Sequence, residues 1–225
     1  MNSFKIISLS EGAFTVDQTK QFVPFNQQYD ELQQRPTGSL LVEVQPFCVI
    51  VNDDVIVLDS GLGFSKNGRL QIHQNLIDNG VPPENVTKVL MSHLHKDHAG
   101  GIAYQTETGN YSLTFPNATY YIQQREFEFA LKTGMPSFIT NNLNILKESS
   151  KVFWLNNNEG TLDNYIQYMV TTAHSPFHQV FSINANGHKI FFGGDDAPQL
   201  QQMKSRFIAK YDYDGKKCME LRRQW

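Results

Sequence analysis

The sequence has few cysteines, little net charge and no long apolar run. Its two cysteines, Cys48 and Cys218, lie far apart and away from the histidines, which provides neither a Cys-x-x-Cys zinc site nor a disulfide framework. We expect both to be ordinary thiols. The formal net charge of −3 lacks the basic excess that nucleic-acid binding requires. A small-molecule partner is therefore favoured over a nucleic acid.

Apolar segments are short. The longest, over residues 47–58, is interrupted by Asn52, Asp53 and Asp54, and no run approaches the ~18 residues that a membrane helix needs. In the first 17 residues a polar residue follows every two or three apolar ones, so this segment lacks the continuous apolar region of a signal peptide. We therefore expect a soluble, cytoplasmic protein with no membrane segment, and we predict a first strand at the N-terminus.

Length and pattern indicate one domain over residues 1–225, because neither a repeat nor a linker divides the chain. β-rich runs at 39–51 and 55–61 flank an Asn-Asp-Asp turn, which is typical of a hairpin. Gly80 and two following prolines end a helical pattern over 69–80. Further elements are predicted as a strand at 87–92, a strand passing into a helix at 119–134, three strands within 165–196 and a helix at 215–225. Mixed sheets packed against helices in layers account for this alternation.

Histidines are concentrated in the stretch MSHLHKDHAGG at residues 91–101. His93 and His95 follow a buried strand and project to one side of an extended chain, and Asp97 would follow if the chain stayed extended. In an extended chain His98 would point to the opposite side from His93 and His95, so the chain must turn there. The glycines at 100 and 101 permit the turn. The candidate ligands before and after the turn therefore face slightly different points. Such an arrangement suits two nearby metal ions better than one tetrahedral site.

Two more candidate ligands follow apolar runs. His174 comes after YMVTT and Asp195 after KIFFGG, so three strands bring metal-binding side chains to one rim. Imidazole and carboxylate are the ligands that zinc takes in hydrolytic centres, and a carboxylate between two cations can bridge them.

These motifs resemble those of the metallo-β-lactamase-fold hydrolases. The signature His-x-His-x-Asp-His stands at residues 93–98, after DSG at 59–61 and before AHSPFH at 173–178 and GGDD at 193–196. The order and separation of the motifs agree over most of the chain. The resemblance implies an α/β fold, a four-layer αββα sandwich with mixed β-sheets and a two-metal site at the edges of the inner sheets.

The resemblance also implies roles for individual residues. His93, His95 and His174 would hold the first zinc ion. The second would be bound by Asp97, His98 and Asp195, with Asp195 bridging. Asp59 would orient ligands without binding metal itself.

Other polar residues have simpler interpretations. We expect His178 to support the site rather than bind metal, and we expect His73 and His188 to lie on the surface. Asp196 competes with Asp195 for the bridging role. Because adjacent strand residues face opposite ways, only one should reach the metals, and the Gly-Asp order favours Asp195.

Two bound metals supply hydroxide at neutral pH and polarise a carbonyl, so we expect hydrolysis of an ester, lactone or thioester, with Asp97 handling the proton. HLHKDHAGG and the later YDYDG at 211–215 are most similar to the lactonase branch, which includes acyl-homoserine-lactone hydrolases. Alternatives are a glyoxalase II-like thioesterase, a β-lactamase and an iron-dependent persulfide dioxygenase.

One expected ligand is missing. Members of this family usually complete the second metal site with a later histidine, yet none follows His188. The sequence favours a chain that lacks its C-terminal end, with a weakened second site. The alternative is that water or another side chain fills this position.

Overall fold

The computed structural model describes residues 4–225, and its centre is a pair of β-sheets. The larger sheet has the order β1-β5-β6-β9-β12-β13, with antiparallel pairs from β1 to β6 and parallel pairs from β6 to β13. The smaller sheet, β14 to β17, is antiparallel throughout. The bounds are β1 Lys5–Ser8, β5 Phe47–Val51, β6 Asp54–Leu58, β9 Lys88–Leu90, β12 Thr119–Gln123, β13 Val152–Leu155, β14 Glu159–Leu162, β15 Ile166–Val170, β16 Gln179–Ala185 and β17 His188–Phe192.

The two sheets pack on each other through one apolar cluster. Val49, Ile56 and Leu90 of the larger sheet lie in the same buried cluster as Ile166 and Phe181 of the smaller sheet. Burial of such side chains stabilises the fold by ~25 cal/mol per Å² of apolar area removed from water. The sandwich is therefore held by the faces that the two sheets share.

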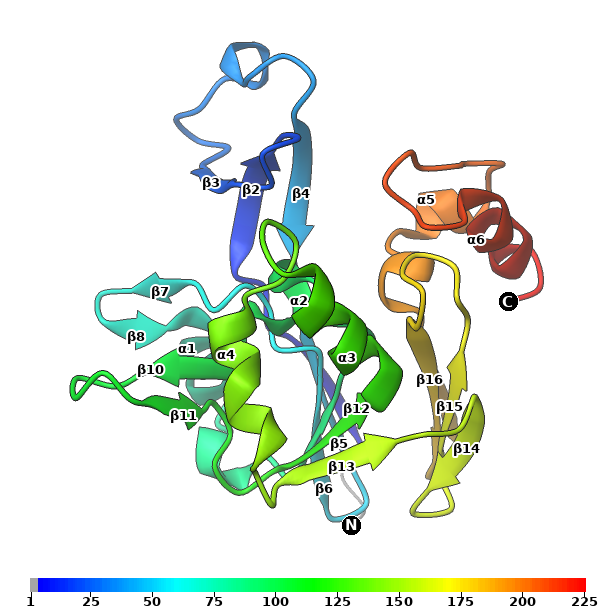
Figure 1. The fold of residues 1–225 in the computed structure, drawn as a ribbon. Coiled ribbons are helices and arrows are strands. Elements are labelled where there is room, and N and C mark those ends of the chain that lie inside the picture. Colours follow the sequence, from blue (N-terminus) through cyan, green and yellow to red (C-terminus); the bar gives the residue numbers. More distant parts are fainter. Residues whose placement is uncertain (1–3) are drawn as a thin grey trace.

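Helices cover the other face of the larger sheet (Figure 1). These are α1 Gln71–Asp78, α3 Gln124–Thr133 and α4 Thr140–Asn144. Ile72 and Leu76 of α1 and Phe127 of α3 belong to a second buried cluster with Val57 and Val89 of the sheet. The predicted α/β sandwich is confirmed, with a mixed larger sheet and an antiparallel smaller one. Helices α5 Leu200–Met203 and α6 Gly215–Arg222 lie beyond one end of the smaller sheet rather than across its face.

A three-stranded arm projects from this body (Figure 1). It consists of β2 Gly12–Val16, β3 Phe22–Phe25 and β4 Leu40–Val44, in the order β3-β2-β4. The remaining elements are η1 Leu32–Gln34, β7 Ser65–Lys66, β8 Arg69–Leu70, η2 Pro83–Asn85, α2 Lys96–Ala99, η3 Gly100–Ile102, β10 Ala103–Gln105, β11 Tyr111–Leu113, η4 Ile145–Lys147 and η5 Gly194–Asp196. No helix in the described part of the chain is both long and apolar enough to cross a bilayer.

The arm corrects two expectations from the sequence. The run at 39–51 forms two strands in different sheets, β4 and β5, which are separated by Gln45 and Pro46. Proline cannot donate to a strand ladder, so the run divides there. The N-terminal segment likewise gives β1 in the larger sheet and β2 in the arm, and its first three residues lie outside the described part.

Other predicted elements are present. β5 and β6 form the hairpin, with Asn52 in the left-handed region at φ 54°. β16 and β17 are joined through Asn186 and Gly187, at φ 53° and 76°, as the Asn-Gly turn requires. The helices at 69–80, 119–134 and 215–225 and the strand at 87–92 also occur within the predicted segments.

Glu11 joins the arm to the loop that follows β6. Its carboxylate accepts hydrogen bonds from the backbone N–H groups of Leu62 at 2.6 Å and Phe64 at 2.9 Å. Glu11 is 5% exposed. Burial raises its pKa from 4.5 to about 7, although the backbone N–H groups oppose this shift. The loop that follows Asp59 is thereby fixed by a carboxyl group that titrates near neutrality.

Glu11 is expected to make stability depend on pH. Because the pKa is higher in the folded state than the unfolded value near 4.5, protonated Glu11 stabilises the fold below pH 4.5, and this contribution is lost as the pH rises to about 7. The loss is at most about 3 kcal/mol. Urea unfolding of wild-type protein and Glu11→Gln between pH 4.5 and 8 should show the variant gaining stability relative to wild type. Glu107→Gln, at an exposed turn, is the control, and a pH-independent difference for Glu11→Gln would contradict this linkage.

Candidate metal centre

The candidate ligands converge at the ends of four strands. His93 and His95 follow β9, and Asp97 and His98 lie in the short helix α2. His174 lies in the loop between β15 and β16, and Asp195 lies in η5, which follows β17. Strands of both sheets thus contribute, and the site lies where the two sheets meet at one edge.

The first ligand set consists of three imidazoles. His95 Nδ1 lies 2.9 Å from His93 Nε2 and 3.1 Å from His174 Nε2. Three nitrogen ligands on tetrahedral zinc with bonds of 2.0–2.1 Å would be separated by about 3.3 Å. His93 and His174 are almost fully buried, at 1% and 4% exposed. The donor set and its spacing therefore fit a zinc ion, with His93, His95 and His174 as its ligands.

The second set shares an edge with the first. His98 Nε2 lies 3.1 Å from an Asp195 oxygen and 3.8 Å from an Asp97 oxygen. The other Asp195 oxygen lies 3.2 Å from His174 Nε2. Asp195 therefore faces both sets, one oxygen to each, as a bridging carboxylate would. Among the described residues, Asp97, His98 and Asp195 form a group that could hold a second ion, and Asp59, His93 and His98 form another.

Asp59 orients two of the histidines. Its carboxylate lies 2.7 Å from His98 Nδ1 and accepts hydrogen bonds from the Ser92 backbone N–H and hydroxyl, both at 2.7 Å. The same hydroxyl lies 3.0 Å from His93 Nδ1. Since Asp59 engages the Nδ1 side of His98, Nε2 of that ring faces Asp195 and Asp97. Asp59 thus has the ligand-orienting position expected from the sequence.

The charges of the site are strongly coupled. Burial, reinforced by the neighbouring histidines, holds the pKa of His93 well below its usual value. Burial also lowers the pKa of His98, but Asp195 and Asp97 outweigh it and raise that pKa well above the usual value. Removal from solvent raises the pKa of Asp97 against the opposing effect of His98. For Asp195, burial is outweighed by His98 and His174, which lower its pKa.

His174 has a carboxylate partner that sequence reasoning missed. Asp212 Oδ1 lies 2.9 Å from His174 Nδ1, and its other oxygen lies 3.9 Å from the guanidinium of Arg222 in α6. Arg222 also donates from Nε to the Asp196 carbonyl at 2.5 Å. The side chains of His174, Asp212 and Arg222 are buried. Helix α6 thereby connects the segments that carry His174 and Asp195, and YDYDG at 211–215 was the only sign of this in the sequence.

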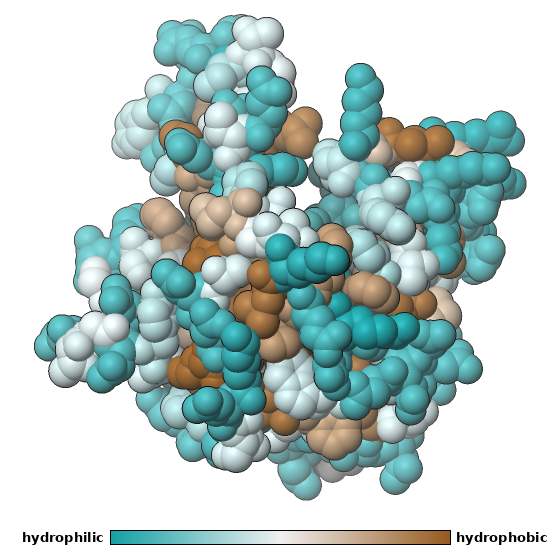
Figure 2. All heavy atoms as spheres, in the orientation of Figure 1, coloured by the Kyte–Doolittle hydropathy of each residue, from teal (hydrophilic) through white to brown (hydrophobic). Residues whose placement is uncertain are grey.

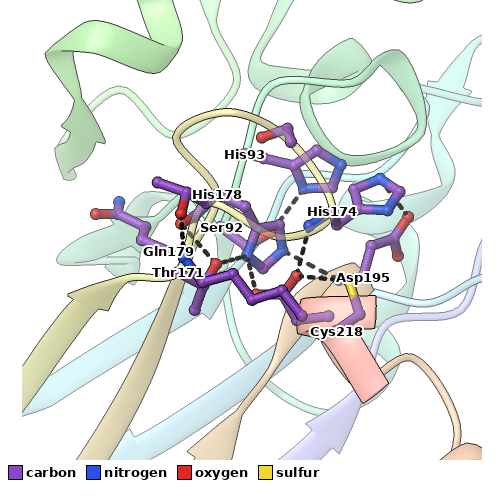
Figure 3. A network of polar contacts seen from close by, with 12 residues as sticks. Ser92, His93, Thr171, His174, His178, Gln179, Asp195 and Cys218 are labelled. Carbon is purple, nitrogen blue, oxygen red and sulfur yellow. Dashed lines mark hydrogen bonds and ion pairs between the residues drawn. The ribbon is translucent and has the colours of Figure 1, made fainter. Parts of the chain in front are cut away.

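His178 occupies a supporting position. Its Nδ1 lies 2.9 Å from an Asp196 oxygen, and its Nε2 accepts the backbone N–H of Asp195 at 3.2 Å. Figure 3 shows His178 among Ser92 and Thr171, while Asp195 lies beside His174. With both ring nitrogens engaged, His178 has no free lone pair for a metal. Asp196 is fully buried, and its pKa is lowered to about 2 because His178 outweighs the effect of burial.

Glu126 was also missed. This carboxylate in α3 is 1% exposed and accepts hydrogen bonds from the Leu94 backbone N–H at 3.3 Å and from the Ser175 hydroxyl at 2.9 Å. It therefore connects the segment of His93 and His95 with that of His174. Nothing in the helical pattern around residue 126 distinguishes it from a solvent-exposed helix residue.

Three details of the sequence analysis need correction. Asp97 does not continue an extended chain, because α2 begins at Lys96. Gly100 and Gly101 are required by close packing as well as by the turn, since a Cβ would lie 2.3 Å from the Leu62 carbonyl and 2.2 Å from the Ser60 carbonyl, respectively. His73 is partly buried, with Nε2 2.9 Å from the Thr114 carbonyl, rather than on the surface.

The site opens into a cleft of about 660 Å³. The arm forms one wall, with Val16, Phe22 and Leu40, and the segments after β17 form another, with Gln199 and Tyr211. Figure 2 shows the hollow between these two projections. The floor carries five of the six candidate ligands, so a molecule of small size would reach them directly; these are His95, Asp97, His98, His174 and Asp195, whereas His93 lies behind the surface of the cleft.

The family model described as the metallo-beta-lactamase superfamily matches residues 41–207. The chain belongs to this superfamily. The match spans most of β4, both sheets apart from β1, and every candidate ligand, so the order of motifs read from the sequence is confirmed at the level of the family.

Curated relatives are N-acyl homoserine lactonases named AttM. The protein from Azorhizobium caulinodans is 33% identical over 117 residues, which are 50% of this chain and 37% of the relative. The one from Agrobacterium fabrum is 31% identical over 119 residues, 49% of this chain and 40% of the relative. The chain thus aligns with about two fifths of the length of these relatives.

Solved structures share the fold. A probable metal-dependent hydrolase from Staphylococcus aureus superposes with a TM-score of 0.74 at 19% identity, covering 97% of this chain and 82% of the other. AidC, a dizinc quorum-quenching lactonase with bound N-hexanoyl-homoserine product, superposes with a TM-score of 0.69 at 20% identity. This superposition covers 99% of this chain and 85% of AidC.

Replacing Asp212 by Asn should weaken metal binding. The substitution keeps the shape but removes the charge that polarises His174, and loss of such a partner costs 10–100-fold in metal affinity. Zinc affinity is measured by competition with a chromophoric chelator, with circular dichroism to show that the fold persists. Asp53→Asn in the exposed β5–β6 turn is the control. Equal zinc affinities of Asp212→Asn and wild type would exclude this role.

Proposed function

We propose that this protein is a metal-dependent hydrolase that opens a lactone or cleaves a related carboxylic ester, with N-acyl homoserine lactones as the first candidates. The observation that carries the proposal is the pair of adjoining ligand sets that share Asp195 at the floor of an open cleft. Curated relatives named N-acyl homoserine lactonase support the substrate class. The substrate would be a small molecule.

Zinc is the metal that the donor set favours, with His93, His95 and His174 at one position and Asp97, His98 and Asp195 at the other. When bound, such ions lower the pKa of water to ≈ 7 and withdraw electrons from a carbonyl oxygen. The protein's part is to hold these ligands rigidly. Asp59, Asp212 and Glu126 fix the ligand segments through the hydrogen bonds described above.

Asp97 has the position and the charge state for proton transfer. Hydrolysis adds water across the acyl carbon–oxygen bond, so one proton of the water must reach the departing alkoxide oxygen. Asp97 borders the cleft beside His98, so its ionised carboxylate can present a basic oxygen to a water molecule there. It takes the proton from water and returns it to the leaving oxygen, and no net proton is consumed in that exchange.

Tyr211 offers a hydrogen-bond donor on the cleft wall. It lies close to His174, with ring centroids 6.0 Å apart, and is 43% exposed. Burial of its inner part, together with Asp195 and Asp212, raises its pKa to about 12. The phenol therefore stays protonated at neutral pH and can donate to a substrate oxygen.

Hydrolysis is expected to require bound metal. Purified protein should open N-hexanoyl-homoserine lactone, and exhaustive treatment with a chelator should abolish the reaction, because bound metal is what lowers the pKa of water to ≈ 7. Added zinc should restore it. Parallel assays with a glutathione thioester, a β-lactam and oxygen uptake on a persulfide separate the alternatives. Full lactone turnover by metal-free protein would refute the proposal.

Substitution of Asp97 tests its proton-transfer role. Asp97→Asn keeps the shape but removes the basic oxygen, so kcat should fall 10²–10⁴-fold, the range that general acid–base groups contribute. Thermal unfolding and zinc content distinguish lost chemistry from lost structure. Asp78→Asn, at the exposed end of α1, is the matched control. Wild-type kcat at unchanged zinc content would assign the proton transfer to another group.

A further inference from the structure

The cleft wall that the arm forms is the edge of a strand. The residues that line the cleft there run consecutively from Val42 to Phe47. Because neighbouring side chains of a strand point to opposite faces, one face alone would contribute only every second residue. β4 is also the last strand of its sheet, with β2 on its other side, and it lies on the side of the arm that faces α5 and α6 (Figure 1). The free edge of β4 therefore forms this part of the wall.

Two carbonyl groups show which backbone groups point away from the cleft. The Val44 carbonyl accepts the Glu11 N–H at 2.9 Å, and the Pro46 carbonyl accepts the Leu9 N–H at 2.8 Å. Both carbonyls therefore point toward the segment that runs into β2. In an extended chain the N–H and C=O groups of successive residues alternate between the two edges. The residues between and before these two must present their backbone groups to the free edge.

The N–H groups of Glu43 and Gln45 are the donors at these alternate positions. Outside the strand ladders, the backbone hydrogen bonds within residues 4–225 include none that either N–H donates, and no described strand pairs with this edge of β4. Acceptors are already present in the cleft as the carboxylates of Asp97 and Asp195. An N–H group that a ligand removes from water costs free energy unless the ligand supplies an acceptor. The wall thus favours a molecule that brings a carbonyl oxygen to it.

The same edge leads outward from the metal site. Phe47 pairs with Leu58 in the β5–β6 hairpin, one residue before Asp59, so the inner end of this segment lies beside the floor of the cleft. From there the strand extends back to Leu40, which also lines the cleft. A substrate with its scissile carbonyl at the ligands would extend along this edge.

We propose that the free edge of β4 binds the substrate through an amide carbonyl, which accepts a hydrogen bond from the N–H of Glu43 or Gln45. This inference rests on the proposed hydrolase function and narrows its substrate class to lactones or esters that carry a secondary amide beside the scissile bond. The interaction is the addition of one extended segment to a sheet edge, in which main-chain hydrogen bonds supply the affinity. Lactones that lack an amide should bind less well.

A single-atom change in the ligand tests this proposal. The zinc-loaded protein is titrated calorimetrically with N-hexanoyl-homoserine, the opened product of the candidate lactone, and with its thioamide analogue, in which sulfur replaces the amide oxygen. The sulfur is a weaker acceptor, whereas the thioamide N–H is a stronger donor. We expect the thioamide to bind about fivefold more weakly, which corresponds to one hydrogen bond of about 1 kcal/mol. Tighter binding of the thioamide would overturn the proposal.

Proline variants assign the effect to the edge. Glu43→Pro and Gln45→Pro each remove one N–H from the free edge, where a sheet tolerates proline. Glu43→Ala and Gln45→Ala are the controls, because they remove only the side chain, including the Glu43 carboxylate that accepts the Ser10 hydroxyl at 2.7 Å. At least one proline variant should bind amide and thioamide equally, while both alanine variants should keep the wild-type ratio. Circular dichroism and zinc content show that the variants are folded and loaded.

NMR of the wild-type protein covers the case in which proline disrupts the arm. In ¹⁵N-labelled, zinc-loaded protein, N-hexanoyl-homoserine should shift the N–H resonance of Glu43 or Gln45 downfield and slow its exchange with solvent. The Val42 N–H, which by the same alternation points to β2, should not respond. Unchanged resonances of both edge N–H groups at saturating product would contradict the proposal.

The outcomes separate this inference from the proposed function. If lactones are opened but amide and thioamide bind equally, or the difference persists in both proline variants, the hydrolase stands and the edge site is wrong. If the edge N–H resonances respond to protein concentration rather than to product, the edge pairs with a second copy of the chain and the inference is again wrong. If no lactone is opened, the proposed function fails, and the inference that rests on it falls as well.

Discussion

The constraint on which the site depends is the approach of three imidazoles, with His95 Nδ1 lying 2.9 Å from His93 Nε2 and 3.1 Å from His174 Nε2. Such nitrogens cannot all be protonated at this distance, and neutral rings do not attract one another through their lone pairs. The surrounding structure must therefore hold them together, and a metal ion bound between them would make the arrangement favourable. Burial and mutual repulsion already hold the pKa of His93 low, which keeps that ring in the neutral form that binds metal.

Buried carboxylates hold the ligands in place. Asp59 directs His98 and, through the Ser92 hydroxyl, His93. Asp212 directs His174, and Asp196 holds His178, whose Nε2 in turn accepts the backbone N–H of Asp195. Each carboxylate is itself held by backbone N–H groups or by Arg222, so the ligand positions are determined by the folded chain around them. This explains why His93 and His174 are nearly fully buried although the site opens into a cleft.

Close backbone packing is the second requirement. Gly100 and Gly101 allow the ligand-bearing loop to approach the Ser60–Leu62 carbonyls more closely than any side chain would permit. Glu11 holds the opposite side of the same loop from the arm. The arm is thus connected to the metal centre through one carboxyl group as well as through the contact of Lys96 with Phe22. A wall of the cleft and the floor of the site are consequently parts of one packed unit.

The sequence by itself determined the family, the sandwich architecture and the six candidate ligands, because the spacing of His93 to His98 and the placement of His174 and Asp195 after apolar runs are local features. Hairpins such as β16–β17 were also predictable, since Asn186 and Gly187 suffice to form the turn. Only the tertiary structure decided which carboxylates support the ligands. Asp212 and Glu126 lie 38 and 48 residues from His174, and their roles arise from burial beside it, which no local pattern encodes. The division of residues 39–51 between two sheets, and the cleft that the resulting arm borders, likewise depend on long-range packing.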